Sequence, residues 1–292
     1  MRASFRYLRP LSQEEACQLK DKHKDAAKCI AGGSDLLIQW RRGQAVFDYC
    51  LDLTHISDLR HYECTSNELR IGAIATLSDL EKAKPQNQFM SCIGTAVKLM
   101  CTPQLRTLAT AGGNLCNASP AGDLGVVFVA LGAEVTLTSC SGERTIPIES
   151  FFVGVNKTQL GEEELLTGVR IALPDRDVGA TFSRIGRTVV DIAQANVATC
   201  ITVGSDGVIE EARIALGAVA PTPIRSESAE KMLLGLKLDA VRDSTIRQAA
   251  DAAQQTAKPI SDIRASAEYR SYVTNVLVRR SLQQSIQSIK GA

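Results

Sequence analysis

Apolar residues in the first part of the chain form short runs that end at glycine or at polar turn residues. Runs of this length with partial alternation are typical of buried strands, and helical spacing appears between them, as at Leu36, Leu37 and Trp40. Ser12, with Glu15 at the capping-box position, predicts the start of another helix. The predicted strands are 26–31, 49–53, 68–75, 134–138 and 165–173. The predicted helices are 12–22, a short one from residue 34, and about 91–99.

The sequence Pro-Asp-Arg-Asp at 174–177 interrupts this pattern and predicts a domain boundary. Beyond it, three apolar runs predict a three-stranded antiparallel meander, with Ser205-Asp206-Gly207 as the tight turn between the last two strands. Since 292 residues are many for one core, we predict an α+β fold with a front domain over 1–175 and a smaller sheet-and-helix domain over 178–292. The strands of the back domain are 180–186, 196–203 and 212–219, and its helices are 226–234, 239–257 and 266–289.

Charge and cysteine content narrow the classes of partner. Lys plus Arg number 33 and Asp plus Glu number 32, a balance that argues against nucleic acid or an anionic membrane as the main partner. The chain has no run of about 18 apolar residues and no signal peptide, so no membrane span is expected. The nine cysteines are odd in number and none are spaced as Cys-x-x-Cys. This usage is typical of a reduced, cytoplasmic chain without a metal or iron–sulfur site of its own.

Two glycine-containing segments carry the candidate chemistry. The first, GGSD at 32–35, joins a predicted strand to a predicted helix, where glycine permits positive φ and free N–H groups face an anion. The second, TAGGNLCNASPAGDL at 110–124, is rich in Gly, Asn, Ser and Pro and is predicted to form a long turn-rich loop. We expect Gly113 in this loop to take positive φ and to present its N–H to a pyrophosphate.

Polar side chains of the second segment suit a nucleotide. Asn114, Asn117 and Ser119 supply donors, and the Asp123 carboxylate can accept from the hydroxyls of a ribose or ribityl chain. The alternatives are a plain turn at the first segment and a loop whose polar groups cap one another at the second. The Gly-x-Gly-x-x-Gly fingerprint of dinucleotide-binding folds is absent from both.

Together the two segments resemble the FAD loops of the flavin subunits of molybdenum hydroxylases, the family of xanthine, carbon monoxide and nicotinate dehydrogenases. The usual forms there are Ala-Gly-Gly-Thr-Asp-Leu and Thr-Ile-Gly-Gly-Asn-x-x-Asn-Ala-Ser-Pro-x-x-Asp, so Ser34 and Ala111 are small departures. RIGAIATLSDLE at 70–81, PQLRTLAT at 103–110 and LGAVAPTPIRS at 216–226 resemble further segments of that family. The resemblance covers nearly the whole chain.

This resemblance implies a two-lobed FAD-binding domain of the vanillyl-alcohol-oxidase-like type, with lobes over about 1–56 and 57–175 and non-covalent FAD between them. The residues implied around the pyrophosphate are Ile30, Ala31, Gly32, Gly33, Ser34, Asp35, Leu36, Thr110, Ala111, Gly112, Gly113 and Asn114. Asn117, Ser119 and Asp123 are implied at ribityl or ribose oxygens. Met100, Cys101 and Leu166 are implied near the flavin ring. Arg184 aligns with a lysine of the family, and arginine bonds differently from lysine.

The resemblance also implies a function. In that family a large subunit hydroxylates an organic substrate at a molybdenum cofactor, and a small subunit passes the electrons through two [2Fe-2S] clusters to the flavin. The flavin ring is then the redox group, no side chain of this chain is itself catalytic, and the final acceptor is an external one such as NAD or oxygen. The implied assembly is a dimer of heterotrimers in the cytoplasm.

Two other functions stay open. One is a free-standing flavin oxidase of the same FAD fold, although the segment after Pro174 is short for a substrate domain of its own. The other is a nucleotide-binding scaffold that carries no flavin. The sequence does not identify the hydroxylated substrate, because that pocket lies in another chain, and it does not distinguish NAD from oxygen.

Overall fold

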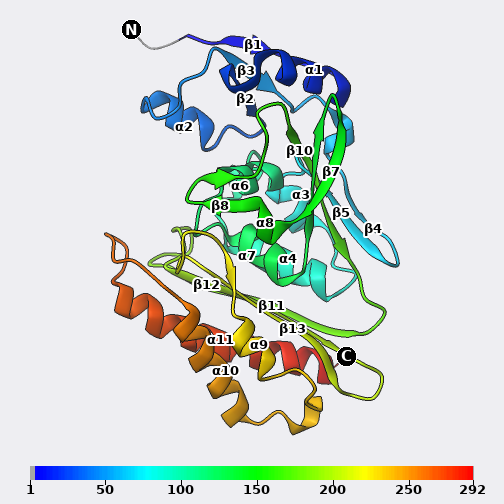
Figure 1. The fold of residues 1–292 in the computed structure, drawn as a ribbon, viewed down its shortest axis with the longest axis vertical. Helices are drawn as coiled ribbons and strands as arrows, with labels where there is room; N and C mark the ends of the chain where they lie inside the picture. The colour runs from blue at the N-terminus through cyan, green and yellow to red at the C-terminus, as the bar shows by residue number, and fades with distance from the viewer. Residues whose placement is uncertain (1–3, 292) are drawn as a thin grey trace.

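The computed structural model describes residues 4–291, which form three parts stacked along the long axis of the molecule (Figure 1). The N-terminal lobe is a parallel three-stranded sheet in the order β1-β3-β2, with α1 and α2 beside it. Ser12 caps α1 by accepting from the Glu15 N–H, while the Glu15 carboxylate accepts from Leu11 N–H and closes no capping box on Ser12. The elements are β1 Arg6–Leu8, α1 Gln13–His23, β2 Ala27–Ile30, α2 Leu36–Arg41 and β3 Tyr49–Asp52.

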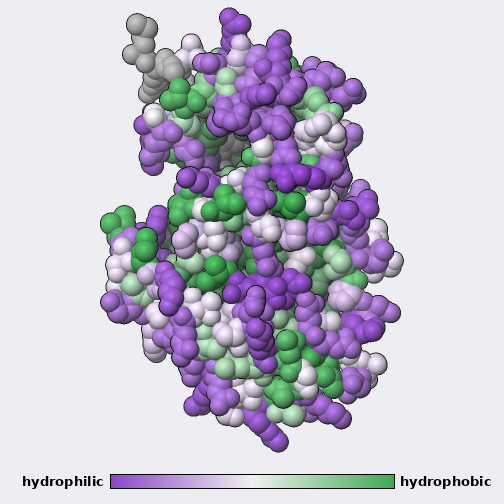
Figure 2. Space-filling model, in the orientation of Figure 1, coloured by the Kyte–Doolittle hydropathy of each residue, from purple (hydrophilic) through white to green (hydrophobic). Residues whose placement is uncertain are grey.

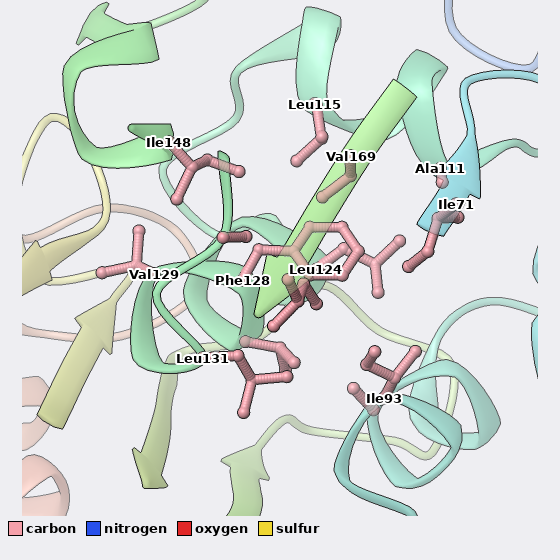
Figure 3. Close-up of a cluster of buried hydrophobic side chains, with 14 of the residues drawn as sticks. Ile71, Ile93, Ala111, Leu115, Leu124, Phe128, Val129, Leu131, Ile148 and Val169 are labelled. Carbon is pink, nitrogen blue, oxygen red and sulfur yellow. The ribbon is translucent and has the colours of Figure 1, made fainter. Parts of the chain in front are cut away.

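The middle lobe contains an antiparallel five-stranded sheet in the order β4-β5-β10-β6-β7. Its helix α7 is buried at every position, and Figure 3 shows Phe128 and Leu124 of α7 among side chains of the sheet and of α4 and α6. The strands are β4 Tyr62–Cys64, β5 Glu68–Gly72, β6 Glu134–Ser139, β7 Gly142–Pro147, β8 Phe152–Gly154, β9 Lys157–Thr158 and β10 Leu165–Ala172. The helices are α3 Leu77–Lys82, α4 Gln88–Leu99, α5 Pro103–Arg106, α6 Ala111–Asn117, α7 Asp123–Ala130 and α8 Ile148–Phe151.

The back part is an antiparallel sheet in the order β11-β12-β13-β14, with helices on both faces. Phe182 and Ala198 join the core of the middle lobe, whereas Val197 and Ile201 pack with α10 and α11. Every residue of β12 is therefore buried, and its polar side chains find partners inside, as Asn196 does with Asp123 and Thr199 with Ser285. The elements are β11 Asp177–Ile185, β12 Ala195–Val203, β13 Ile209–Gly217, β14 Ile224–Arg225, α9 Glu227–Lys231, α10 Asp243–Thr256 and α11 Ala267–Lys290.

Most predicted elements are confirmed within a few residues, including the turn at 205–207, where Gly207 has φ +78°. The sheet of the back part has a short fourth strand, β14, beside the three predicted. The prediction of a long loop over 110–124 is wrong, because α6 and the start of α7 occupy most of it. Gly112 is helical and packs so closely on Ala73 that a Cβ there would lie 2.7 Å from the Ala73 carbonyl oxygen. The missing side chain of Gly112 therefore allows α6 to pack closely on Ala73, and this glycine does not form a turn.

Candidate cofactor site

A cavity of about 380 Å³ lies between the N-terminal lobe and the middle lobe, where the surface narrows in Figure 2. Most of its lining comes from the turn between β2 and α2, from the helix α6 and from the chain around β9, and α1 adds Lys20. The structure thus brings the two glycine-containing segments together although some 80 residues separate them. The sequence-predicted residues on its wall are Ile30, Ala31, Gly32, Gly33, Ser34, Asp35, Leu36, Thr110, Gly113, Asn114 and Asn117.

Glycine is required at two positions of the β2–α2 turn. Gly33 has φ +68°, a conformation that L side chains rarely adopt. A Cβ on Gly32 would lie 1.8 Å from the Leu108 carbonyl oxygen, so the turn lies directly on the chain that leads into α6. Gln39 of α2 adds a side-chain link between the two walls, since its Nε2 donates to Asn117 Oδ1 at 3.2 Å.

The helix α6 has its N-cap at Thr110, whose Oγ1 accepts from the Gly113 N–H at 3.1 Å. The expectation of a free N–H and positive φ at Gly113 is therefore wrong, because this residue is helical and its N–H is used by the cap. Gly113 still faces the cavity: apart from neighbours in the chain and its own helix backbone, a Cβ there would have only Thr110 Oγ1 within 4 Å. Gly113 therefore matters because it lacks a side chain and leaves space in the cavity, not because of its backbone freedom.

Asn114 shows that the cavity suits a hydroxyl-bearing ligand. Its side-chain oxygen is buried and has no hydrogen-bond partner among the described residues, although Asn114 lines the cavity. A buried acceptor without a partner is destabilising, and a donor from a bound molecule would satisfy it. The ribose and ribityl hydroxyls of FAD are donors of this kind, so the residues present fit the group that the sequence resemblance implies.

Charged groups at the cavity were missed by sequence reasoning. The Lys20 side chain lies on the buried face of α1, and its Nζ donates to the carbonyl oxygens of Lys24 and Ala27. Burial lowers the pKa of this amine; on the same cavity, burial raises the pKa of the carboxyl of Asp35, which the sequence did predict. The further residues that line this part are Asp25, Lys28, Thr158, Leu160, Gly161 and Glu162. No motif marks them, because they come from three separated segments.

Asp123 and Arg184 lie elsewhere and contact each other. Arg184 Nη1 donates to Asp123 Oδ2 at 2.6 Å, and Asn196 Nδ2 donates to Asp123 Oδ1 at 2.5 Å. Burial raises the pKa of the Asp123 carboxyl, while Arg184 and Asn196 oppose that rise. Both carboxylate oxygens are thus engaged within the chain, and Asn196 is a partner that the sequence did not indicate.

The remaining predicted residues do not line this cavity. Met100, Ala111 and Leu166 belong to the core of the middle lobe, and Cys101 packs against it with a positive φ of 38°. Gly112 lies buried against Ala73, and Ser119 follows α6 on the way to α7. No helix within the described chain is both long and apolar enough to span a membrane. Residues 4–291 also contain no group of three or more His, Cys, Asp or Glu side chains placed to hold a metal ion.

Known proteins match the chain over nearly its full length. Residues 3–174 match the family described as the FAD binding domain in molybdopterin dehydrogenase, and residues 180–285 match the CO dehydrogenase flavoprotein C-terminal domain. The carbon monoxide dehydrogenase medium chain of Afipia carboxidovorans is 32% identical over 282 residues, or 97% of this chain and 96% of that one. Caffeine dehydrogenase subunit beta of a Pseudomonas species is 34% identical over 235 residues, or 80% and 79%. Carbon monoxide dehydrogenase from Hydrogenophaga pseudoflava has a solved chain with a TM-score of 0.92, 30% identity and 99% coverage of both chains.

Proposed function

Since the chain belongs to the family of FAD-binding medium subunits of molybdenum hydroxylases, we propose that the cavity between its first two lobes holds part of an FAD molecule. One observation carries this assignment: two distant segments meet around a cavity lined by Asn114, whose buried side-chain oxygen has no partner among the described residues. FAD supplies hydroxyl donors for such an acceptor and a pyrophosphate for the backbone of the β2–α2 turn. When bound, FAD exchanges electrons singly or in pairs.

The residues of the cavity divide the binding tasks. Gly32 and Gly33 let the turn backbone approach the pyrophosphate, and the absence of a side chain at Gly113 leaves room for it on the opposite wall. Lys20 places a positive charge in the same cavity, where it offsets phosphate charge more strongly than in bulk water. Asn114 and Asn117 bind hydroxyls of the sugar. Beyond the cavity, Met100, Cys101 and Leu166 are the residues that would face the flavin ring.

We further propose that this chain carries out one half of a redox reaction. It takes electrons from the [2Fe-2S] clusters of a small partner subunit, while a large partner subunit holds the molybdenum cofactor and the organic substrate. FAD held by this chain would supply the chemistry that delivers these electrons to an external acceptor such as NAD or oxygen. In this proposal the complex is a cytoplasmic dimer of heterotrimers. This chain itself divides near residues 175–178 into a FAD domain and a back domain.

The test begins with the purified chain and its flavin. Acid or heat is expected to release FAD in a 1:1 ratio to the chain, because the family resemblance implies that FAD binds non-covalently. A colourless chain that takes up no added FAD would refute the cofactor assignment and favour a scaffold. Turnover of an organic substrate by the chain alone would instead identify a free-standing flavin oxidase.

A further inference from the structure

The carbonyl groups at the end of α4 are bound in an unusual way. Four consecutive carbonyl oxygens, those of residues 98–101, accept hydrogen bonds from two guanidinium groups. Arg106 Nη1 donates to Lys98 O at 3.4 Å, Met100 O at 2.9 Å and Cys101 O at 3.1 Å. Arg184 Nη1 donates to Leu99 O at 3.0 Å. We call this arrangement the arginine clamp.

Both arginines of the clamp are buried and paired with acids. Arg106 is 7% exposed and makes a two-fold contact with Glu81 at 2.8 and 3.1 Å. The Arg184 side chain is 6% exposed and pairs with Asp123 at 2.6 Å. Buried charges are destabilising unless they are paired and fully hydrogen-bonded, and the carbonyl bonds complete that requirement. The clamp is thus a built feature with little freedom to rearrange.

The segment that the clamp holds has a strained backbone. A helix end leaves its last carbonyl groups without intrahelical donors, and cations are favoured there. Just after α4, Cys101 takes a φ of 38°, a conformation that is unfavourable for any residue other than glycine. The bonds from Arg106 to Met100 O and Cys101 O offset this strain.

Arg184 also connects the 98–101 segment to the end of the second FAD segment. It comes from β11 of the back sheet, against which α4 packs (Figure 1). Besides Leu99 O and Asp123, it donates through Nη2 to Asp191 O in the loop between β11 and β12. Asp123 is the first residue of α7 and follows the stretch 118–122, which leads from Asn117. One guanidinium therefore holds both the 98–101 segment and the end of the second FAD segment.

We propose that Arg106 and Arg184 are positioning residues for the flavin: the clamp fixes the turn that carries Met100 and Cys101, and through Arg184 the back part of the chain sets the environment of the ring. This inference rests on the proposed function, in which Met100 and Cys101 lie beside the ring. Lysine cannot reproduce the clamp, because its single nitrogen cannot span the carboxylate and carbonyl groups that a planar guanidinium reaches.

The test compares three lysine variants of the full chain loaded with FAD. Arg106→Lys and Arg184→Lys keep the positive charge and remove the fork. The matched control is Arg225→Lys, because Arg225 makes the same two-fold contact with a buried carboxylate, Glu230. Its further bond goes to Glu149 of α8, so it donates to none of the carbonyl groups of the clamp. The readouts are the dissociation constant for FAD, the circular dichroism of the bound flavin, its midpoint potential, and thermal unfolding of the apoprotein.

We expect Arg106→Lys to weaken FAD binding by about tenfold, equivalent to about 1.4 kcal/mol, and to change the flavin circular dichroism and potential. Arg184→Lys should change them in the same direction but less, because lysine still pairs with Asp123; it carries the test if Arg106→Lys does not fold. Arg225→Lys should lower the unfolding temperature and leave the flavin unchanged. Unaltered flavin spectra and affinity in both clamp variants would overturn this inference alone. A wild-type chain that binds no FAD would overturn the proposed function, and the inference with it.

Discussion

Replacing Gly113 with valine tests the proposed cofactor wall. Gly113 lies on α6 at the edge of a cavity of about 380 Å³. A Cβ there approaches only Thr110 Oγ1, at 2.9 Å, among atoms outside its own helix backbone and chain neighbours. The branched side chain of valine would therefore project into the cavity, where the proposed function places the cofactor.

The fold should tolerate this change. Glycine is about 1 kcal/mol and valine about 0.5 kcal/mol less favourable than alanine inside a helix, so helix propensity slightly favours the variant. Displacing the Thr110 cap costs about 0.5–2 kcal/mol. The free energy of unfolding of the apoprotein should thus change by no more than about 2 kcal/mol, against a typical margin of about 5–15 kcal/mol. Binding should weaken at least about 100-fold, or about 2.7 kcal/mol.

The assay is thermal unfolding with and without excess FAD, together with the flavin content of the purified protein. A ligand at 100 times its dissociation constant stabilises the folded state by about 2.7 kcal/mol, and the Gly113→Val protein should show no such gain. Gly207→Val is the control: Gly207 has φ +78° in the β12–β13 turn, and a Cβ there has no atom within 4 Å. Its strain of about 1–3 kcal/mol should lower stability without changing FAD affinity.

One result would refute the reasoning. If Gly113→Val retains stoichiometric FAD with an affinity within about threefold of the wild type, or about 0.6 kcal/mol, α6 does not form a wall of the cofactor site. If the apoprotein instead loses most of its stability, the space beside Gly113 is too small for a valine side chain.

Three further changes follow from the structure. Gly32→Ala places a methyl group on the Leu108 carbonyl and should reduce both FAD affinity and apoprotein stability, measured by titration and thermal unfolding; loss of neither would contradict the close approach of the lobes. Asn114→Ala should weaken FAD binding about tenfold while changing apoprotein stability by less than about 1 kcal/mol, because its buried oxygen has no partner within the described chain. The pKa of Asp262 is lowered to about 2 from 3.8 by the Arg264 backbone N–H and by Arg270. The ionised Asp262 carboxylate stabilises the folded state fully above pH 3.8, and this stabilisation is lost as the pH falls toward 2. After allowance for solvent screening, Asp262→Asn should therefore lower the free energy of unfolding by about 1 kcal/mol at neutral pH but by little near pH 2. Equal losses at both pH values in chemical unfolding would exclude the ionic contribution.

Local patterns were sufficient for most of the fold. Apolar runs, helical spacing and the Ser12 cap predict elements that depend on neighbours within a few residues, and these predictions are confirmed. The resemblance of the segments at 31–37 and 110–124 to a known family is also a property of the sequence, and it identified the family to which the chain belongs.

Only the tertiary structure decided features that depend on contacts between distant segments. Gly112 and Gly113 have the same composition signal as a turn, yet they lie in a helix that Thr110 caps. Glycine is needed there because Ala73 leaves no room for a side chain at 112 and the cavity lies beside 113. Lys20 faces the cavity because α1 packs with that side inward. Arg184 reaches Asp123 because β11 and α7 meet across the boundary between the middle lobe and the back sheet. A single sequence does not indicate which charges become partners, because ion-pair strength depends on distance and burial, and both arise only when the chain is folded.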